Sequence, residues 1–236
     1  LGQFSEKRLI VVEGLYKKGP EENLVSGGLN DLATKGRVVV YQLINRAGIP
    51  DHASMFDLAV YWKDSLLYEK IILDYDDIEI EPIAELSLFC ADRAQHVQEF
   101  IRPKLSEGKI VLCDRFYDST IAYQGYGRGL DPEMVKKLGF SAALGVIPTI
   151  TFLIDISVNT ALSRIIERPG RNRIDDESFE FHNRVRKSYL SLYKKQGNRI
   201  FLIDGEKSIN DVQRDIRKIL KSRFSIFKRL EKFDKL

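Results

Sequence analysis

A short stretch near the middle of the chain gathers side chains that bind cations, phosphates and sugars or bases. Asp114 and Arg115 come at the end of an apolar run, 110–113, that is typical of a buried parallel strand. Open α/β sheets bind ligands outside the carboxyl ends of their strands, where this acid and this arginine are expected. A carboxylate can bind a metal cation and a guanidinium group can bind phosphate. Hydroxyl, amide and guanidinium groups follow in the next segment, at Ser119, Tyr123, Gln124 and Arg128.

Apolar runs typical of strands alternate with helix-like segments along the chain. The strand-like runs are 9–13, 38–42, 110–114, 150–154 and 200–203, and the helix-like segments are 82–105, 132–143, 158–166 and 179–195. This alternation predicts an α/β fold in which helices cover both faces of a parallel sheet. The 236 residues contain no internal repeat and no linker rich in Pro, Gly or Ser, so we expect one domain over 1–220.

The composition is typical of an ordinary globular protein, with 44% hydrophobic and 30% charged residues. A net charge of +3 is too small to indicate a nucleic-acid partner. No apolar run reaches the roughly 18 residues that would span a membrane, and no signal-peptide pattern is present. Cys90 and Cys113 lie in apolar runs without the spacing of metal ligands, which predicts reduced thiols and a cytoplasmic location.

The last twenty residues, 217–236, carry eight lysines and arginines against two acidic residues. Apolar residues recur there at helical spacing: Leu220, Phe224, Phe227 and Leu230. We therefore treat 221–236 as a basic amphipathic extension. Such a helix can lie on an anionic membrane or dock on a partner. We expect instead a terminal helix that packs on its own domain or frays in solvent, without membrane contact.

The blocks 88–96 and 110–130 closely resemble the thymidylate kinase family. The resemblance implies a P-loop NTPase-like three-layer α/β/α sandwich with a five-stranded parallel sheet. It also implies the nucleoside monophosphate kinase type of this fold, with a lid over residues 164–176. The family transfers the γ-phosphoryl group of ATP to dTMP with Mg²⁺ and usually forms a homodimer, so both properties are implied by analogy.

The resemblance also assigns roles on the acceptor side. Phe89 would stack on the thymine ring and Arg93 would hydrogen-bond the base, although these two could instead be a core residue and a partner of Glu85 or Asp92. Arg115 would contact the acceptor phosphate and Asp114 would lie beside Mg²⁺, although the two could form a structural ion pair. Three further residues match family positions around the sugar and base: Ser119, Tyr123 and Gln124.

Four arginines surround Pro169-Gly170 at the position of the family lid: Arg164, Arg168, Arg171 and Arg173. Lid arginines neutralise charge on the transferred phosphoryl group, and we expect this catalytic role for the last three. A solvated basic loop is the alternative.

The segment that would grip ATP departs from the family pattern. A phosphate-binding loop has Gly-x-x-x-x-Gly-Lys-Ser/Thr between a strand and a helix. Gly14 and Gly19 keep the glycine spacing, but Pro20 and Glu21 replace the lysine and the hydroxyl residue. Tyr16 replaces a family acid. One unit-charge interaction is worth about 4 kcal/mol near a protein surface, so these exchanges predict a large loss of ATP affinity.

Three functional hypotheses follow. The first is a family member that keeps a dTMP-type acceptor site but has little or no ATP-dependent kinase activity, and that binds a thymidine nucleotide or a protein partner in a regulatory or structural role. The second is a working dTMP kinase, in which Lys17, Lys18 and the lid arginines replace the missing ATP-binding groups and ATP and Mg²⁺ are used. The third, which we favour least, is a membrane- or nucleic-acid-associated protein that works through the basic extension.

Overall fold

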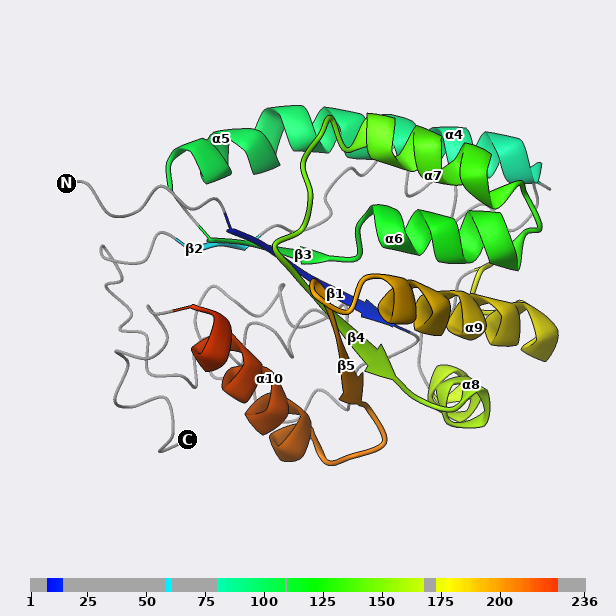
Figure 1. The fold of residues 1–236 in the computed structure, drawn as a ribbon. Helices are drawn as coiled ribbons and strands as arrows, with labels where there is room; N and C mark the ends of the chain where they lie inside the picture. The colour runs from blue at the N-terminus through cyan, green and yellow to red at the C-terminus, as the bar shows by residue number, and fades with distance from the viewer. Residues whose placement is uncertain (1–7, 15–57, 61–79, 109, 168–172, 225–236) are drawn as a thin grey trace.

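Five parallel strands form the centre of the structure, in the order β2-β3-β1-β4-β5 (Figure 1). The computed structural model describes residues 8–14, 58–60, 80–108, 110–167 and 173–224. The strands are β1 (Arg8–Gly14), β2 (Leu58–Val60), β3 (Ile110–Asp114), β4 (Ile150–Asp155) and β5 (Ile200–Asp204). Because all of them run the same way, their carboxyl ends meet at one edge of the sheet.

The backbone register places the end of β1 between two other strand ends. Val12 of β1 pairs with Asp114 of β3, and Gly14 of β1 pairs with Ile154 of β4. The first residue of the predicted ATP loop therefore lies at the same sheet edge as the predicted metal-binding acid.

Most helices lie on one face of the sheet, and α10 lies on the other (Figure 1). The helical elements before β4 are α4 (Pro82–His96), the π-helical η1 (Val97–Ile101), α5 (Arg102–Ser106), α6 (Tyr117–Thr120), the π-helical η2 (Ile121–Gly127) and α7 (Pro132–Ala142). Those after β4 are α8 (Val158–Ile166), α9 (Phe179–Lys195) and α10 (Ile209–Arg223).

Local sequence signals explain where these helices begin. Pro82 occupies the first turn of α4, where a missing N–H costs little. The Asp131 carboxylate accepts hydrogen bonds from the backbone N–H groups of Glu133 and Met134 at the start of α7. Serine hydroxyls cap the three later helices in the same way, at Ser157, Ser178 and Ser208.

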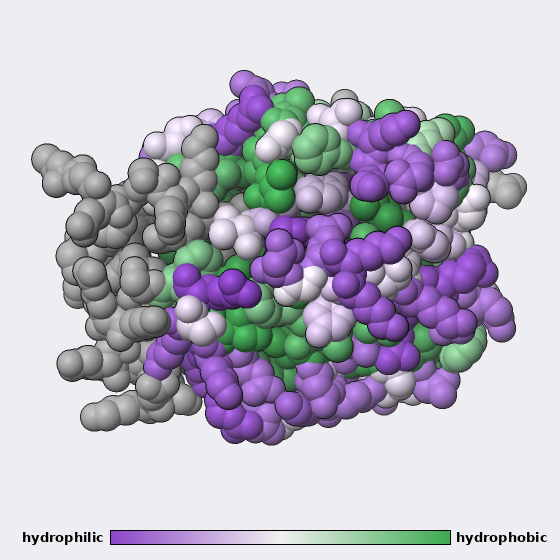
Figure 2. All heavy atoms as spheres, viewed as in Figure 1, coloured by the Kyte–Doolittle hydropathy of each residue, from purple (hydrophilic) through white to green (hydrophobic). Residues whose placement is uncertain are grey.

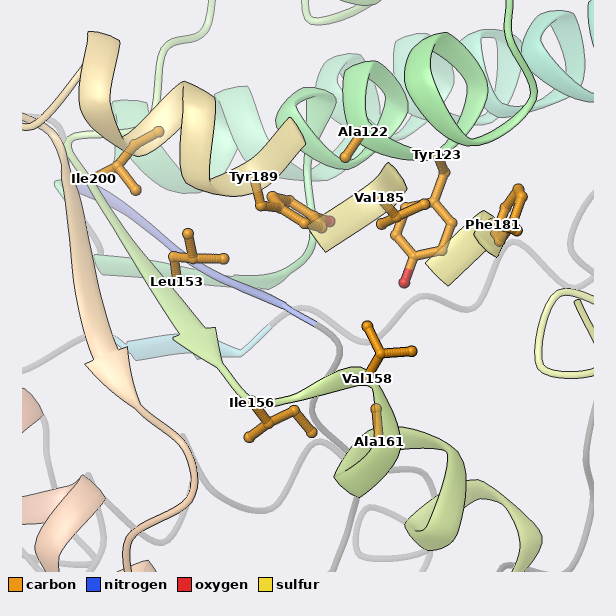
Figure 3. Close-up of a cluster of buried hydrophobic side chains, with 10 residues drawn as sticks. All are labelled: Ala122, Tyr123, Leu153, Ile156, Val158, Ala161, Phe181, Val185, Tyr189 and Ile200. Atoms are coloured by element: carbon orange, nitrogen blue, oxygen red, sulfur yellow. The ribbon is translucent and has the colours of Figure 1, made fainter. Parts of the chain in front are cut away.

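Two hydrophobic clusters hold the helices on the sheet. One packs the η1–α5 helix and α6 against β3, with Val97, Ile101 and Val111 fully buried. The other packs η2, α8 and α9 against β4 and β5 (Figure 3). Gly127 at the end of η2 lets α9 approach closely, because a Cβ atom there would lie 2.8 Å from Phe181 Cε2.

A buried ion pair ties the two clusters together. Arg199, just before β5, donates from Nη1 to Asp118 Oδ2 at 2.8 Å and from Nη2 to Asp118 Oδ1 at 3.1 Å. The same Nη1 also donates to Thr151 Oγ1 in β4 at 2.8 Å. The pair therefore fixes the amino-terminal end of α6 against two strands of the sheet.

The predicted α/β fold with a parallel sheet is confirmed, and most element bounds agree within a residue or two. The predicted strand 38–42 lies outside the described residues. The strand paired with β3 at the sheet edge is Leu58–Val60, which the sequence analysis did not predict. Helix α10 extends past the predicted domain boundary at 220 to Arg223, with Leu220 and Phe224 buried.

Hydrophilic residues cover much of the face seen in Figure 2, and a hydrophobic band is visible between α9 and α10. The groove there is lined by a few apolar residues of β5 and α10, including Leu202, Ile203 and Ile219, and by a larger number of charged and polar residues. In the described part of the chain, no helix combines the length and the apolar character needed to cross a membrane.

Candidate acceptor site

Asp114 and Arg115 lie where β3 ends, as the sequence predicts. Arg115 has a φ of 62°, in the left-handed region that glycine adopts readily but that most L-residues adopt rarely. Such a conformation costs on the order of 1–3 kcal/mol and persists where the surroundings enforce it. The Cys113 thiol donates to the Arg115 carbonyl oxygen at 3.0 Å, which helps to hold this turn. The extended conformation of β3 therefore ends at Arg115.

The Arg115 guanidinium group lies over the ring of Tyr123, with its central carbon 4.8 Å from the ring centre. This distance is within the range of a cation–π interaction. The Tyr123 side chain extends from η2, with its hydroxyl directed away from that helix (Figure 3). Its ring contacts Phe181 and Tyr189 of α9, with centre-to-centre distances of 6.1 and 6.3 Å. The structure therefore brings two residues of the predicted acceptor site, Arg115 and Tyr123, into contact, and aromatic rings of α9 pack against Tyr123.

Ser119 is buried beside the same aromatic group. Its hydroxyl forms a hydrogen bond of 2.7 Å with the Tyr189 hydroxyl. A ligand that uses Ser119 would therefore have to share this hydroxyl with Tyr189.

Helix α4 carries Phe89 and Arg93 one turn apart, so both residues face the same side. Arg93 donates from Nη2 to the Phe116 carbonyl oxygen at 3.3 Å, and its guanidinium carbon lies 5.6 Å from the Phe116 ring centre. Phe116 directly follows Arg115 in the chain. The contact therefore brings the predicted base-binding helix to the end of β3.

Glu85 of α4 is a buried acid with several partners, and the sequence analysis gave it no functional role. It accepts a hydrogen bond from Gln124 Nε2 at 2.8 Å, and bonds from Arg128 Nε at 3.2 Å and Nη2 at 3.0 Å. It also forms an ion pair with Arg173. Its partners are therefore Arg128 and Arg173, rather than the Arg93 that the sequence analysis considered as an alternative. Glu85 lies four residues before Phe89, a helical spacing that could have placed it on the site face of α4.

Arg128 also pairs with Glu177, so it joins two acids. Burial lowers the pKa of the Arg128 guanidinium group, but hydrogen bonds and charges from Glu85 and Glu177 outweigh this effect and raise the pKa above its usual value. The arginine stays charged, and its guanidinium carbon lies 4.9 Å from the Phe181 ring centre. Residues at the start and near the end of the predicted lid, 164–176, also bond to other elements: Arg164 donates to the Gly205 carbonyl oxygen at 3.5 Å, and Arg173 pairs with Glu85.

Several predicted site residues cannot be placed. Arg168 and Arg171 of the lid lie outside the described residues. The same holds for the ATP loop beyond Gly14, namely Tyr16, Lys17, Lys18, Gly19, Pro20 and Glu21. The groove between β5 and α10 is lined by none of the predicted site residues that the structure describes.

A family model, "Thymidylate kinase", matches residues 67–216. The chain belongs to the thymidylate kinase family. A thymidylate kinase of Desulfovibrio desulfuricans is 46% identical over 149 residues, which is 60% of this chain and 69% of the relative. One from a Nostoc species is 35% identical over 204 residues, covering 78% of this chain and 95% of the relative. The crystal structure of thymidylate kinase from Ehrlichia chaffeensis superposes with a TM-score of 0.62 at 28% identity, covering 90% of this chain and 98% of that one.

These similarities confirm the predicted family and the P-loop nucleoside monophosphate kinase fold. The region matched by the thymidylate kinase model contains all the predicted acceptor-side residues and the lid, but it begins after the ATP loop. The roles assigned to individual residues remain predictions.

The carboxylate at the end of β3, Asp114, is compatible with Mg²⁺ binding. The described residues contain no group of three or more His, Cys, Asp or Glu side chains that could hold a metal ion. Mg²⁺ in kinases usually keeps several waters and is held by one or two carboxylates together with substrate phosphates. Asp114 alone therefore fits this mode of binding, in which most ligands come from the nucleotide and solvent.

Proposed function

We propose that this member of the thymidylate kinase family binds dTMP at the acceptor site and transfers phosphate from ATP slowly or not at all. The observation that carries the first half is the linked set of contacts around the end of β3. Arg115 lies on Tyr123, and Arg93 is bonded to Phe116. Through Glu85, Gln124 is bonded to the helix that carries Phe89.

In this proposal, Arg115 neutralises the phosphate of dTMP while Phe89 and Arg93 contact the thymine. Tyr123 fills the space that a 2′-hydroxyl group would occupy, and Gln124 and Ser119 contact the base and the sugar. Each pairing matches the chemistry of the group involved, because guanidinium groups bind phosphate in a forked geometry and aromatic rings stack on bases.

The second half rests on the sequence of the ATP loop. Pro20 supplies neither a charge nor an N–H group, and Glu21 brings a negative charge toward the polyphosphate. If transfer occurs, Asp114 would help to hold Mg²⁺ and the lid arginines, Arg168, Arg171 and Arg173, would stabilise the transferred group.

A working dTMP kinase is the second candidate, because relatives at 41–46% identity are named thymidylate kinase. Lys17, Lys18 and the lid arginines would then have to grip ATP. Here the cofactors would be ATP and Mg²⁺.

Separate calorimetric titrations with dTMP and with ATP test the proposal. We expect measurable binding of dTMP and little binding of ATP. A coupled assay with Mg-ATP and dTMP distinguishes the candidates, because turnover above about 1 s⁻¹, the low end for ordinary kinases, would favour the second. Restoring the loop with Tyr16→Asp, Pro20→Lys and Glu21→Thr should raise activity if the first is right.

The proposal also covers the domain bounds, the oligomeric state and the location of the protein. We infer a kinase-like domain over 1–220 with a lid over 164–176, a basic extension over 221–236, and a homodimer in the cytoplasm. Cys90 and Cys113 form no disulfide bond, which is compatible with a reducing compartment. Light scattering of the full chain tests the dimer, and truncation after Phe224, beyond the end of α10, tests whether the rest of the extension affects localisation.

A further inference from the structure

Glu85 joins donors that come from two later parts of the chain. One carboxylate oxygen, Oε1, accepts from Gln124 Nε2 and Arg128 Nε, and the other, Oε2, accepts from Arg128 Nη2 at 3.0 Å and from Arg173. Glu85 has no exposed surface, and Gln124 is only 2% exposed. A buried carboxylate with this many charge-assisted bonds cannot rotate freely, so it holds its donors in fixed positions.

The hydrogen bond from Gln124 Nε2 to Glu85 determines which end of the Gln124 amide is left for a ligand. A glutamine amide has a donor end and an acceptor end, whereas an ionised carboxylate only accepts. The reversed amide would put its carbonyl oxygen against Glu85 Oε1 at a distance that is now a hydrogen bond of 2.8 Å, which is repulsive. Gln124 Oε1 therefore faces away from Glu85. Within the described ranges no donor bonds to this oxygen.

We propose that Glu85 is a positioning residue that sets the pyrimidine preference of the acceptor site through Gln124. This inference rests on the proposed function, because it requires Gln124 to contact the base. A hydrogen-bond acceptor that is held in place, such as Gln124 Oε1, favours a base that presents a hydrogen-bond donor to it. Thymine and uracil carry a hydrogen on N3, whereas N3 of cytosine is itself an acceptor and would meet Gln124 Oε1 lone pair to lone pair.

The neighbouring ion pairs supply a matched control. Arg128 bonds to Glu177 as well as to Glu85, and Glu177 has no bond with Gln124 among the described residues. Glu177→Gln therefore removes a charge from the same network without freeing the Gln124 amide. Glu85→Gln removes the charge that fixes the amide, while it keeps the shape of the side chain.

The test is calorimetric titration of the full chain with dTMP, dCMP and N3-methyl-dTMP. The unaltered chain should bind dTMP at least about 100-fold more tightly than the other two, because a site built to donate or accept a hydrogen bond rejects analogues that cannot complete it. Glu85→Gln should reduce this preference about tenfold, since one buried hydrogen bond is lost or misdirected. Glu177→Gln should leave the preference unchanged.

A double variant shows whether Glu85 acts through Gln124. Gln124→Leu should also reduce the preference, and adding Glu85→Gln should reduce it no further, because coupled residues are not additive. If Glu85→Gln keeps the full preference for dTMP, or if the effects of the two substitutions add, the inference about Glu85 is wrong, while the proposed function is unaffected. If Glu85→Gln does not fold, titration of the unaltered chain still tests the inference, because equal affinity for dTMP and N3-methyl-dTMP would contradict it. Absence of dTMP binding by the unaltered chain would overturn the proposed function as well.

Discussion

Arg115 and Tyr123 form a cation–π pair across the end of β3, with the guanidinium carbon 4.8 Å from the ring centre. The pair combines a strained backbone with a rigid ring. Arg115 leaves the strand with a φ of 62°, and Tyr123 is held by Phe181 and Tyr189. The structure thus fixes the arginine from two sides, which would lower the ordering cost of the phosphate binding proposed above.

Substitutions of Arg115 should separate stability from binding. Arg115→Gly relieves the cost of a Cβ atom at positive φ, whereas Arg115→Ala retains it, so the glycine variant should be more stable than the alanine variant by about 1 kcal/mol. Both variants should lose dTMP affinity to a similar extent, because both lose the guanidinium group. Urea unfolding and calorimetry measure the two effects. Equal stability of the two variants would show that the turn is not strained.

The close approach of α9 to η2 should make Gly127 intolerant of any side chain. A Cβ atom there would lie 2.8 Å from Phe181 Cε2 and 3.0 Å from Val185 Cγ2. Gly127→Ala should destabilise the protein by about 1–3 kcal/mol, the usual range for overpacking a core. Gly125→Ala is the control, because the nearest atom to its Cβ would be Pro132 Cα at 3.7 Å. Thermal unfolding of both variants gives the comparison, and similar losses would refute the packing argument.

The buried pair of Asp118 and Arg199 should contribute strongly to stability. Asp118→Asn leaves the Arg199 charge without its carboxylate in the core, and removal of one partner from such a pair typically costs about 3–5 kcal/mol. The exposed pair of Lys104 and Glu107 provides a contrast, because Lys104→Ala should cost less than about 1 kcal/mol. Chemical denaturation measures both. A loss for Asp118→Asn as small as that for Lys104→Ala would count against this role.

Cys90 should react slowly with alkylating agents at neutral pH. Burial raises the pKa of its thiol, and the nearby charge of Arg93 only partly opposes the shift. Because the thiolate is the reactive form, the alkylation rate should lie below that of a free peptide thiol at pH 7 and rise as the pH increases. Arg93→Met should slow the reaction further, because it removes the charge that favours the thiolate. Peptide mapping of iodoacetamide-treated protein follows Cys90 apart from Cys113.

Much of the fold follows from local pattern. The apolar run that became β3 and the capped helices α8 and α9 are defined by signals within a few residues, so their bounds agree with the sequence prediction. The edge strand β2 is only three residues long, and its pairing with β3 depends on tertiary structure that no short window contains.

The site was predictable where it follows a contiguous motif and less so elsewhere. Asp114, Arg115 and Tyr123 lie in one block of sequence, and their position relative to the sheet edge follows from the strand. Glu85 was given no role because its partners lie 39, 43 and 88 residues away, in segments that meet only in the folded chain.

The central position of β1 has a consequence for synthesis. Its neighbours on both sides come from much later in the chain, since Ile10 pairs with Leu112 on one side and with Ile150 on the other. On the ribosome β1 emerges with these two backbone edges uncovered, and β3, just before the middle of the chain, can cover one edge before β4 covers the other. Unpaired strand edges are templates for association between chains. The nascent protein is therefore vulnerable to aggregation through β1 until β4 emerges, and a chaperone that shields β1 should improve its yield.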